Sequence, residues 1–501
     1  MSGKKKHSIG NSIPRFIFVG LSVLFQAGWV LLTALVLNEH YPWVALITRI
    51  LSLLLILAIN GKQGNAAFKM PWIMLIMAFP VMGLSLYLLL VGFGDMGKTG
   101  KRMQAVRSAI HSQLPEGTGE ENGLSRYLQD RVGFPAYRNT AVQYFGEAKN
   151  AFEAMKEDLE KAESFIFLEY FIVSPDSAFE ELCEILIRKA RQGVDVRLMY
   201  DDMGSIRVNL LFAKKLADAG IHCLVFNPAV PILNLFMNHR DHRKITVIDG
   251  KVGYTGGYNL SDEYFDRTRP YGKWKDTGLR LEGEAVRSLT ALFLEMWNTC
   301  ARSNEPIGPF LQISHPVLSD GLVQPYGDDP LGRERVAENV YLNLIYSARK
   351  TLYITTPYLI ITDEMTNALG LAAKRGVDVR IITPGIPDKK TVYAVTRSYY
   401  AGLAARGVRI FQYSPGFIHA KQILCDGKVA SIGTSNLDYR SLYLHFENNV
   451  LLYGGNAIEE MAQDFDNLFA QCEEVTEKYR NGRSRMLRMG QYIIRLFAPM
   501  L

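Results

Sequence analysis

Two copies of one short pattern hold the residues of this chain whose types and spacing best suit nucleophilic and acid–base chemistry. The first copy is HRKITVIDG at 242–250 and the second is HAKQILCDG at 419–427, so both fit His-x-Lys-x-x-x-x-Asp-Gly. On a strand, residues two positions apart project from the same face, and each copy therefore presents an imidazole and an ammonium group together. The catalytic residues predicted from the two copies are His242, Lys244, Asp249, His419, Lys421 and Asp426.

Each copy is followed by a short element with glycine and asparagine, GGYN at 256–259 and GTSN at 433–436. If the two copies face each other, Asn259 and Asn436 add neutral hydrogen-bond donors to two histidines and two lysines around one phosphate. Such a group of donors would stabilise a pentacovalent transition state at phosphorus without a metal. We therefore expect neither a metal site nor another cofactor.

The two histidines would have different roles in such a site. One would attack phosphorus to give a phosphohistidine, while the other would protonate the leaving alkoxide and then deprotonate the incoming hydroxyl. Histidine suits both roles because its unperturbed pKa of about 6.5 lies near neutral pH. The sequence does not assign which of His242 and His419 has which role.

A carboxylate usually fixes the tautomer and the orientation of a catalytic histidine. Asp276 and Glu447 are equivalent candidates, because each lies seven positions before a glycine and is followed by an apolar, strand-like run. We predict that these two residues orient the histidines. Asp249 and Asp426 complete the motifs and are expected to act as structural or secondary electrostatic partners.

Beyond about residue 130 the chain alternates apolar strand-like runs with helical stretches, as in an α/β sandwich of repeated units. GVDVR occurs at 193–197 and again at 376–380, and the apolar pattern of 216–228 returns at 403–415. These ordered repeats indicate an internal duplication. We expect an α/β fold with two duplicated α/β/α sandwich halves, at 136–310 and 311–475, around one active site.

An insertion lies just before the first motif. The offset between the repeats is 187 residues from Gly220 to Gly407, but 177 residues from His242 to His419, so the first half is longer near PAVPILNLFM at 228–237. This apolar loop suits either packing in the core or a lipid-facing edge of the active site.

The first hundred residues are expected to lie in a membrane. The uncharged runs at 16–37 and 71–93 are long enough to cross a bilayer, and a third run at 43–59 carries Arg49. We assign 1–97 to a membrane anchor with two or three transmembrane helices and 98–135 to a linker. Basic residues before and after the anchor place both of its ends in the cytoplasm, which favours a cytoplasmic catalytic part in a multi-pass protein of the cell membrane. Two ends on the same side require an even number of crossings. Three helices would contradict this requirement, so the side stays open.

Charge and cysteine content narrow the other possibilities. The formal net charge of +6 is modest for 501 residues. The five cysteines lie far apart without zinc-finger spacing, which argues against a disulfide framework or a structural zinc site.

The basic tail at 476–501 places apolar and arginine side chains on opposite sides of a helical wheel. That pattern suits either an anionic lipid interface or packing on the protein's own core.

The paired motifs, together with GGYN and GTSNLDYRS behind them, resemble the phospholipase D superfamily over roughly residues 130–475. The apolar N-terminal segments, WKDTGLRLEG and the tail ending RLFAPML make the chain similar to bacterial cardiolipin synthases over nearly its whole length. The resemblance implies that two phosphatidylglycerol molecules react to give cardiolipin and glycerol. One departure is His445, which stands where the family often has asparagine.

Other functions remain open at this point. A phospholipase or another phosphatidyltransferase would use the same motifs, since these specify the phosphodiester step and not the accepting alcohol. A nuclease of the same superfamily would not need membrane segments, and no basic strip interleaved with aromatic residues indicates a nucleic-acid partner. A non-catalytic scaffold that binds anionic lipid would not need both histidines. The sequence leaves the oligomeric state open.

Overall fold

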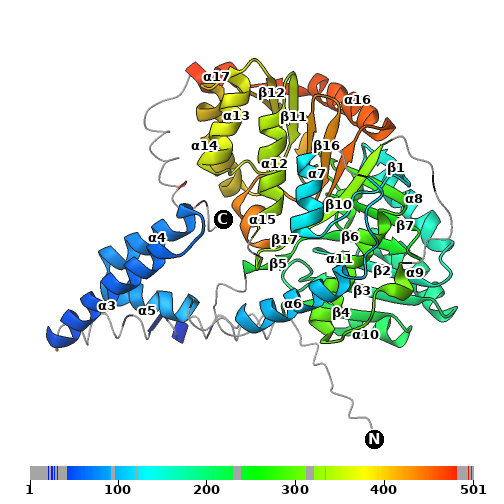
Figure 1. Ribbon diagram of the computed structural model, residues 1–501, viewed down its shortest axis with the longest axis horizontal. Coiled ribbons are helices and arrows are strands. Elements are labelled where there is room, and N and C mark those ends of the chain that lie inside the picture. The colour runs from blue at the N-terminus through cyan, green and yellow to red at the C-terminus, as the bar shows by residue number, and fades with distance from the viewer. Residues whose placement is uncertain are drawn as a thin grey trace, which may run out of the picture.

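The computed structural model describes residues 42–91, 96–119, 122–208, 210–228, 238–311, 321–332 and 334–481, together with positions 21, 24, 25, 27, 28, 31, 317, 495 and 498. Figure 1 shows a large body of sheets and helices and, beside it, a group of N-terminal helices that extends away from the body. Both histidine motifs lie in the body. The insertion at 229–237 falls outside the described residues, as does the basic tail beyond residue 481 apart from positions 495 and 498.

The first half of the body is built on a seven-stranded sheet with the strand order β1-β9-β7-β6-β2-β3-β4. Its central strand β2 (Phe165–Tyr170) is buried at every residue, as the continuous run FIFLEY predicts for a strand covered on both faces. The other strands are β1 (Thr140–Phe145), β3 (Asp195–Asp201), β4 (His222–Phe226), β6 (Lys244–Ile248), β7 (Val252–Gly256) and β9 (Gly278–Gly283).

The second half repeats this arrangement along β10-β17-β16-β15-β11-β12-β13 and adds β18 at the edge. Strand by strand, the order corresponds to that of the first sheet, which confirms the predicted duplication and the α/β class. The strands are β10 (Leu322–Asp328), β11 (Thr351–Thr355), β12 (Asp378–Pro384), β13 (Arg409–Tyr413), β15 (Gln422–Cys425), β16 (Val429–Gly433), β17 (His445–Tyr453) and β18 (Cys472–Glu474).

Helices cover both faces of each sheet. In β2, Ile166 and Leu168 share a core with α8 and α9, whereas Phe167 points to the opposite face and stacks on Phe293 of α11. In β11, Tyr353 contacts rings of α16, while Ile354 on the other face lies among residues of α12 and α13. These helices are α8 (Ala148–Glu160), α9 (Ser177–Arg191), α10 (Leu210–Asp218), α11 (Val286–Ala301), α12 (Val336–Ser347), α13 (Asp363–Lys374), α14 (Lys390–Ala404), α15 (Tyr439–Tyr443), α16 (Asn456–Ala470) and α17 (Thr476–Asn481).

The repeated GVDVR sequence marks equivalent turns from a helix into a strand. Gly193 follows α9 with φ of 94° and Gly376 follows α13 with φ of 91°. A left-handed residue at this place ends a helix with little strain when it is glycine. The residues after each glycine form β3 and β12, which are neighbours of β2 and β11 in their sheets.

Two short strand pairs connect the halves. β5 (Arg240–Asp241) of the first half runs parallel to the start of β17, and β14 (Gly416–Ile418) of the second half runs parallel to β8 (Lys273–Lys275). Each short strand ends directly before a motif histidine. The motifs are therefore held against the opposite half of the body.

The segment expected to be a linker, 98–135, packs on the body. α6 (Met96–His111) lies along α11, where Arg107 forms ion pairs with Glu295 at 3.2 Å and with Asp329 at 3.0 Å. Arg102 donates to the backbone oxygens of Asn298 and Ser303. These arginines are among the basic residues that follow the anchor, and they thus have partners within the protein. The remaining short elements are α7 (Gly123–Tyr127), η2 (Leu128–Val132), η4 (Asp262–Phe265) and η5 (Gly308–Phe310).

The run at 71–93, predicted as one membrane-crossing helix, is interrupted. α4 (Ala66–Ala78) and α5 (Pro80–Val91) are separated by Phe79, and they fold back on each other, since the rings of Trp72 and Tyr87 meet edge to face at 5.3 Å. Proline at the first position of α5 costs no hydrogen bond there and pushes the preceding Phe79 out of the helical region. A Cβ atom on Gly83 would lie 2.7 Å from the Cα of Ile76, so this close approach needs glycine.

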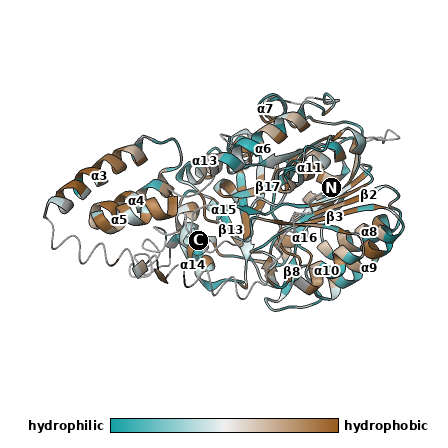
Figure 2. Cartoon of the chain, turned by 90° about the horizontal axis from the view of Figure 1, so that it is seen from below, coloured by the Kyte–Doolittle hydropathy of each residue, from teal (hydrophilic) through white to brown (hydrophobic). Residues whose placement is uncertain are grey.

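α3 (Pro42–Gly61) precedes this hairpin and contains the apolar run at 43–59. Figure 2 shows that α3, α4 and α5 are mostly hydrophobic and project from the body. Among the described residues, no helix combines the length and the apolar character needed to span a membrane. The predicted span at 16–37 lies outside the described residues except for six isolated positions.

Candidate active site

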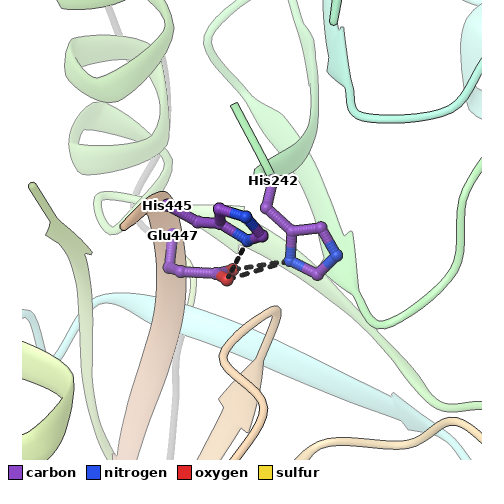
Figure 3. Close-up of side chains that lie close together, drawn as sticks. All are labelled: His242, His445 and Glu447. Carbon is purple, nitrogen blue, oxygen red and sulfur yellow. Dashed lines mark hydrogen bonds and ion pairs between the residues drawn. The ribbon is translucent and has the colours of Figure 1, made fainter. Parts of the chain in front are cut away.

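The first motif histidine is held by a carboxylate from the other half. His242 follows β5, and its backbone N–H donates to the oxygen of Phe446 in β17 at 2.9 Å. The next residue of β17 is Glu447, and both of its carboxylate oxygens lie 2.9 Å from Nδ1 of His242. Figure 3 shows the two side chains pointing toward each other from separate elements.

The second motif histidine repeats this geometry with the halves exchanged. The backbone N–H of His419 donates to the oxygen of Lys275 at 2.7 Å, and Nδ1 of His419 lies 2.6 Å from Oδ2 of Asp276. Asp276 and Glu447 are both completely buried. The structure thus brings the two predicted acids to the two predicted histidines, and each pair joins one residue from each half.

Both histidines are set up as neutral imidazoles. Burial lowers the pKa of His419 to about 4, helped by the nearby charge of Lys421, and burial together with the charges of Lys244 and other cations holds the pKa of His242 well below 6.5. With Nδ1–H donating to a carboxylate, Nε2 keeps its lone pair. Each ring therefore offers a free nitrogen that can take up a proton or attack an electrophile.

The two lysines lie beside the histidines. Nζ of Lys244 donates to the backbone oxygen of His242 at 2.6 Å, and Nζ of Lys421 lies 2.7 Å from Nδ1 of His419. Burial lowers the pKa of Lys244 to about 8 and that of Lys421 to about 7. Because desolvation disfavours these ammonium ions, an anionic ligand between them would be strongly attracted.

The two orienting carboxylates differ in their electrostatics. Burial raises the pKa of Glu447 well above its usual range, although the charge of Lys244 opposes this. Burial would also raise the pKa of Asp276, but the interaction with His419, which includes a hydrogen bond, and the charge of Lys421 outweigh it, so the pKa is lowered. Asp276 is the more firmly ionised of the two acids.

The predicted asparagines occupy different surroundings. Oδ1 of Asn259 accepts from the backbone N–H of Ile172 at 3.0 Å and so holds the loop after β2. Asn436 is buried, and within the described part of the chain its Oδ1 has no hydrogen-bond partner.

Asp249 and Asp426 do not lie with the histidines. Each follows the far end of its motif strand, and five residues of strand span about 16 Å. Asp249 accepts hydrogen bonds from the backbone N–H groups of Glu163, Ser164 and Phe165 at 2.8–2.9 Å. Asp426 likewise accepts from three consecutive N–H groups, at 349–351. They therefore do not join the histidines and lysines of the predicted catalytic set, and their hydrogen bonds fit the structural role, one of the two expected for them: both anchor the chain at the start of a central strand.

Two residues that were not predicted support the first pair. The hydroxyl of Thr434 donates to Glu447, and Oδ1 of Asn448 accepts from the backbone N–H of Lys244 at 3.2 Å. Thr434 lies in GTSN and Asn448 directly follows Glu447, so their positions in the sequence could have indicated them. On the other side, the ring of His419 packs 5.3 Å from the rings of Tyr264 and Trp274.

Comparison with known proteins agrees with this geometry. Residues 155–297 and 341–469, more than half of the chain, match the family described as "Cardiolipin synthase, PLD-like domain". A cardiolipin synthase of Halalkalibacterium halodurans is 35% identical over 452 residues, which cover 86% of this chain and 88% of the relative. An uncharacterized protein of Streptococcus mutans is 40% identical over 459 residues, or 89% of this chain and 99% of the relative.

The crystal structure of phosphatidylserine synthase from Haemophilus influenzae shares the fold, with a TM-score of 0.56 at 15% sequence identity over 76% of this chain and 100% of that chain. A likeness at this level of identity shows the architecture and not the substrate. The family match and the relatives that align along most of their length go further, and they show that this chain belongs to the cardiolipin synthase family of phospholipase D-like proteins.

Proposed function

We propose that this protein transfers a phosphatidyl group from one phosphatidylglycerol to another and releases glycerol, so that the product is cardiolipin. The observation that carries the proposal is the pair of buried histidines, each hydrogen-bonded through Nδ1 to a carboxylate of the opposite half. Such a pair supplies a nucleophile and an acid–base group at the same phosphate. The relatives named cardiolipin synthase support the choice of substrate.

In the first step, Nε2 of one histidine bonds to phosphorus and the bond from phosphorus to the glycerol oxygen breaks. The other histidine gives its proton to that oxygen, so glycerol leaves. In the second step, a hydroxyl of another phosphatidylglycerol loses its proton to the same acid–base histidine and attacks phosphorus. The phosphorus–nitrogen bond breaks, and both histidines return to their first state. The reaction is reversible because equivalent phosphodiester bonds are broken and formed.

The acid–base histidine must be protonated when the first step begins, whereas both rings are neutral in the empty site. An anionic phosphodiester between Lys244 and Lys421 would offset their charges, which are among the causes of the low histidine pKa values. Substrate binding would therefore raise the pKa of the histidine that must carry a proton. Asn436 would add a donor to the phosphate, with Asn259 as its counterpart in the first half.

Burial of the site supports transfer over hydrolysis. His242 and His419 are 7% and 6% exposed, and Lys244 and Lys421 are 0% and 1% exposed. A site closed to this degree limits the access of water to a phosphohistidine, so an alcohol carried on a lipid can compete. A hydrolase of the same fold would need an open path for water to the same phosphorus.

We also propose that the N-terminal segment, 1–97, holds the enzyme on the cell membrane, where its substrates lie. The support is the apolar surface of α3 and of the α4–α5 hairpin, whose exposed large side chains are Trp43, Leu46, Ile47, Ile50, Leu51, Leu53, Leu54, Leu57, Met70, Met74, Met77, Phe79 and Leu88. A continuous exposed surface of this kind is stable in contact with lipid and not with water.

The membrane-facing helices contact the catalytic body next to the site. Nδ2 of Asn65 donates to the hydroxyl of Tyr443 at 2.9 Å, and the ring of Phe68 lies 5.5 Å from that of Tyr443. Tyr443 ends α15, which leads directly into β17 and Glu447. This contact would hold the catalytic halves, which we assign to 136–310 and 311–475, close to the lipid surface.

The test uses the full chain in detergent with phosphatidylglycerol as the sole lipid, and it measures cardiolipin and glycerol together. We expect equal amounts of both products, and no product from His242→Ala or His419→Ala. His222→Ala is the matched control, because His222 is an exposed residue of β4 outside the site. Phosphatidic acid with glycerol would instead identify a hydrolase. Binding of anionic lipid without turnover would identify a scaffold, and either result would overturn the proposal.

A further inference from the structure

His445 lies beside the first histidine pair, at a place that the transfer reaction does not use. It begins β17 two positions before Glu447, so the two side chains project from the same face of the strand. Its ring lies 5.4 Å from that of His242, measured between centroids. Figure 3 shows both imidazoles directed toward the Glu447 carboxylate.

Neither ring nitrogen of His445 has a hydrogen-bond partner among the described residues, although the residue is only 8% exposed. A buried polar group without a partner costs about 1–3 kcal/mol. Such groups are uncommon in folded proteins, and a bound ion is one of the features that can satisfy them. The unpartnered imidazole therefore points to a ligand at this place.

The geometry of the three side chains matches a metal site. Nδ1 of His242 lies 2.9 Å from Glu447, and Nδ1 of His445 lies 3.8 Å from Oε1 of Glu447. One ligand atom from each residue lies within 4.8 Å of the others. Tetrahedral zinc with bonds of about 2.0–2.1 Å places neighbouring ligand atoms about 3.4 Å apart, between the two measured distances.

The donor set also selects the kind of metal. Two imidazoles and one carboxylate suit zinc and similar transition-metal ions, whereas magnesium and calcium prefer oxygen ligands. Three protein ligands would leave a fourth position for water or an anion. We propose that His242, His445 and Glu447 form an inhibitory binding site for a zinc-like divalent cation.

Occupation of this site would exclude catalysis by the first motif. The metal would bind Nδ1 of His242, so the proton of the neutral ring would move from Nδ1 to Nε2. Nε2 would then have no lone pair for attack on phosphorus or for taking up a proton. The metal would also take the Glu447 carboxylate away from the ring. This inhibitory effect rests on the proposed transferase function, whereas metal binding itself does not.

The charges around the site favour a reversible effector over a permanently bound metal. Lys244 lies next to His242 and is buried with it, and its ammonium group opposes a second cation. The other half offers an internal comparison. His419 and Asp276 form an equivalent pair, but rings of Tyr264 and Trp274 surround it, and the described residues provide no third ligand there.

The experiment uses the full chain in detergent, freed of metal with a chelator, and measures binding of Zn²⁺ by equilibrium dialysis. We expect one saturable, reversible site in the wild type. His445→Asn, which supplies the residue often found in the family, should weaken binding by about tenfold or more. His242→Ala should do the same, and His419→Ala should bind like the wild type although it has no turnover. Co²⁺ in place of zinc should give visible tetrahedral absorption bands that disappear in His445→Asn.

Inhibition is then measured as the turnover with zinc divided by the zinc-free turnover of the same variant. Zinc should reduce this ratio in the wild type and much less in His445→Asn. Equal zinc affinity in the wild type and His445→Asn would overturn the site, as would loss of binding in His419→Ala. If His445→Asn does not fold, His445→Gln serves the same comparison. Zinc binding without any transferase activity would contradict the proposed function and leave the metal site intact.

Discussion

Replacement of Glu447 by glutamine tests the role of the cross-half pairs most directly. The amide has nearly the same shape as the carboxylate, and its oxygen can still accept from Nδ1 of His242. Thr434, which donates to Glu447, can rotate to accept from the new amide nitrogen. The substitution thus removes a carboxyl group that can ionise opposite a charged His242 ring, although burial raises its pKa, while it preserves the packing of a completely buried side chain.

The magnitude follows from the charge that develops on the ring. His242 becomes positively charged during the reaction whether it carries the phosphoryl group or the proton, so the expected effect does not depend on its role. A ring charge and a carboxylate about 4 Å apart attract each other by about 4 kcal/mol at an effective dielectric constant of about 20. A neutral hydrogen bond to the amide would recover about 1 kcal/mol. The remaining loss of about 3 kcal/mol corresponds to roughly a 100-fold lower kcat.

The assay is initial-rate formation of cardiolipin from phosphatidylglycerol in detergent micelles. We expect kcat of Glu447→Gln to fall by about 100-fold while KM changes by less than about threefold, because the carboxylate acts mainly in the transition state. If the amide turns its NH₂ group to the ring, the wrong tautomer forms and the loss is larger. Glu295→Gln is the matched control: Glu295 is also completely buried and bonded to a histidine, His111, but outside the site. A kcat within about fivefold of wild type for Glu447→Gln would refute the reasoning.

Three further predictions follow from the site and its supports. As pH rises through about 7 to 8, Lys421 and Lys244 lose the protons that they hold below those values; kcat/KM measured against pH should therefore decline on the alkaline side. Asp249→Asn and Asp426→Asn should each lower stability by about 1–3 kcal/mol, seen as a lower Tm, with kcat of the folded enzyme nearly unchanged, since each acid holds three backbone N–H groups. Gly83→Val should separate α4 from α5, because a Cβ there meets the α4 backbone, and limited proteolysis should then cleave the hairpin faster than in the wild type.

Much of the fold could be predicted from local patterns. The continuous apolar run of β2 and the repeated GVDVR turns depend on residues that are neighbours in the sequence, so they indicate a central strand and a helix end without any knowledge of the whole. The duplication could be predicted for the same reason, since two similar segments fold in the same way. The local pattern of a segment does not show which distant segments it packs against.

The motif aspartates show that residues of one motif need not lie in one site. Asp249 is five residues from Lys244, and the regular spacing suggested one functional group. The intervening residues form β6, which carries the aspartate away from the histidine to the opposite end of the strand. A glycine follows each aspartate, and both aspartates have a positive φ, 52° and 53°. Asp-Gly in each motif therefore marks a tight turn at the end of a strand.

The apolar run at 71–93 is expected to form one membrane-crossing helix, whereas the structure forms two short helices there. An uncharged run indicates contact with an apolar environment but does not give the direction of the chain. Pro80 and Gly83 indicate that the chain reverses here. Proline begins α5 and displaces Phe79 from the helix, and glycine permits α5 to pack closely against α4. Whether an apolar run forms one long helix therefore depends on its helix-breaking residues as well as on its hydrophobicity.

The pairing of each histidine with an acid of the opposite half could not be predicted from the sequence. Each acid follows the motif of its own half and lies seven positions before a glycine, so the repeat is compatible with pairs inside each half and with pairs across the halves. The short strands β5 and β14 decide between the two, because each leads to its histidine along a strand of the other half. A half expressed alone would contain a histidine without its carboxylate. Catalysis by this site therefore requires both halves to be docked, and the interface between them is part of the active site.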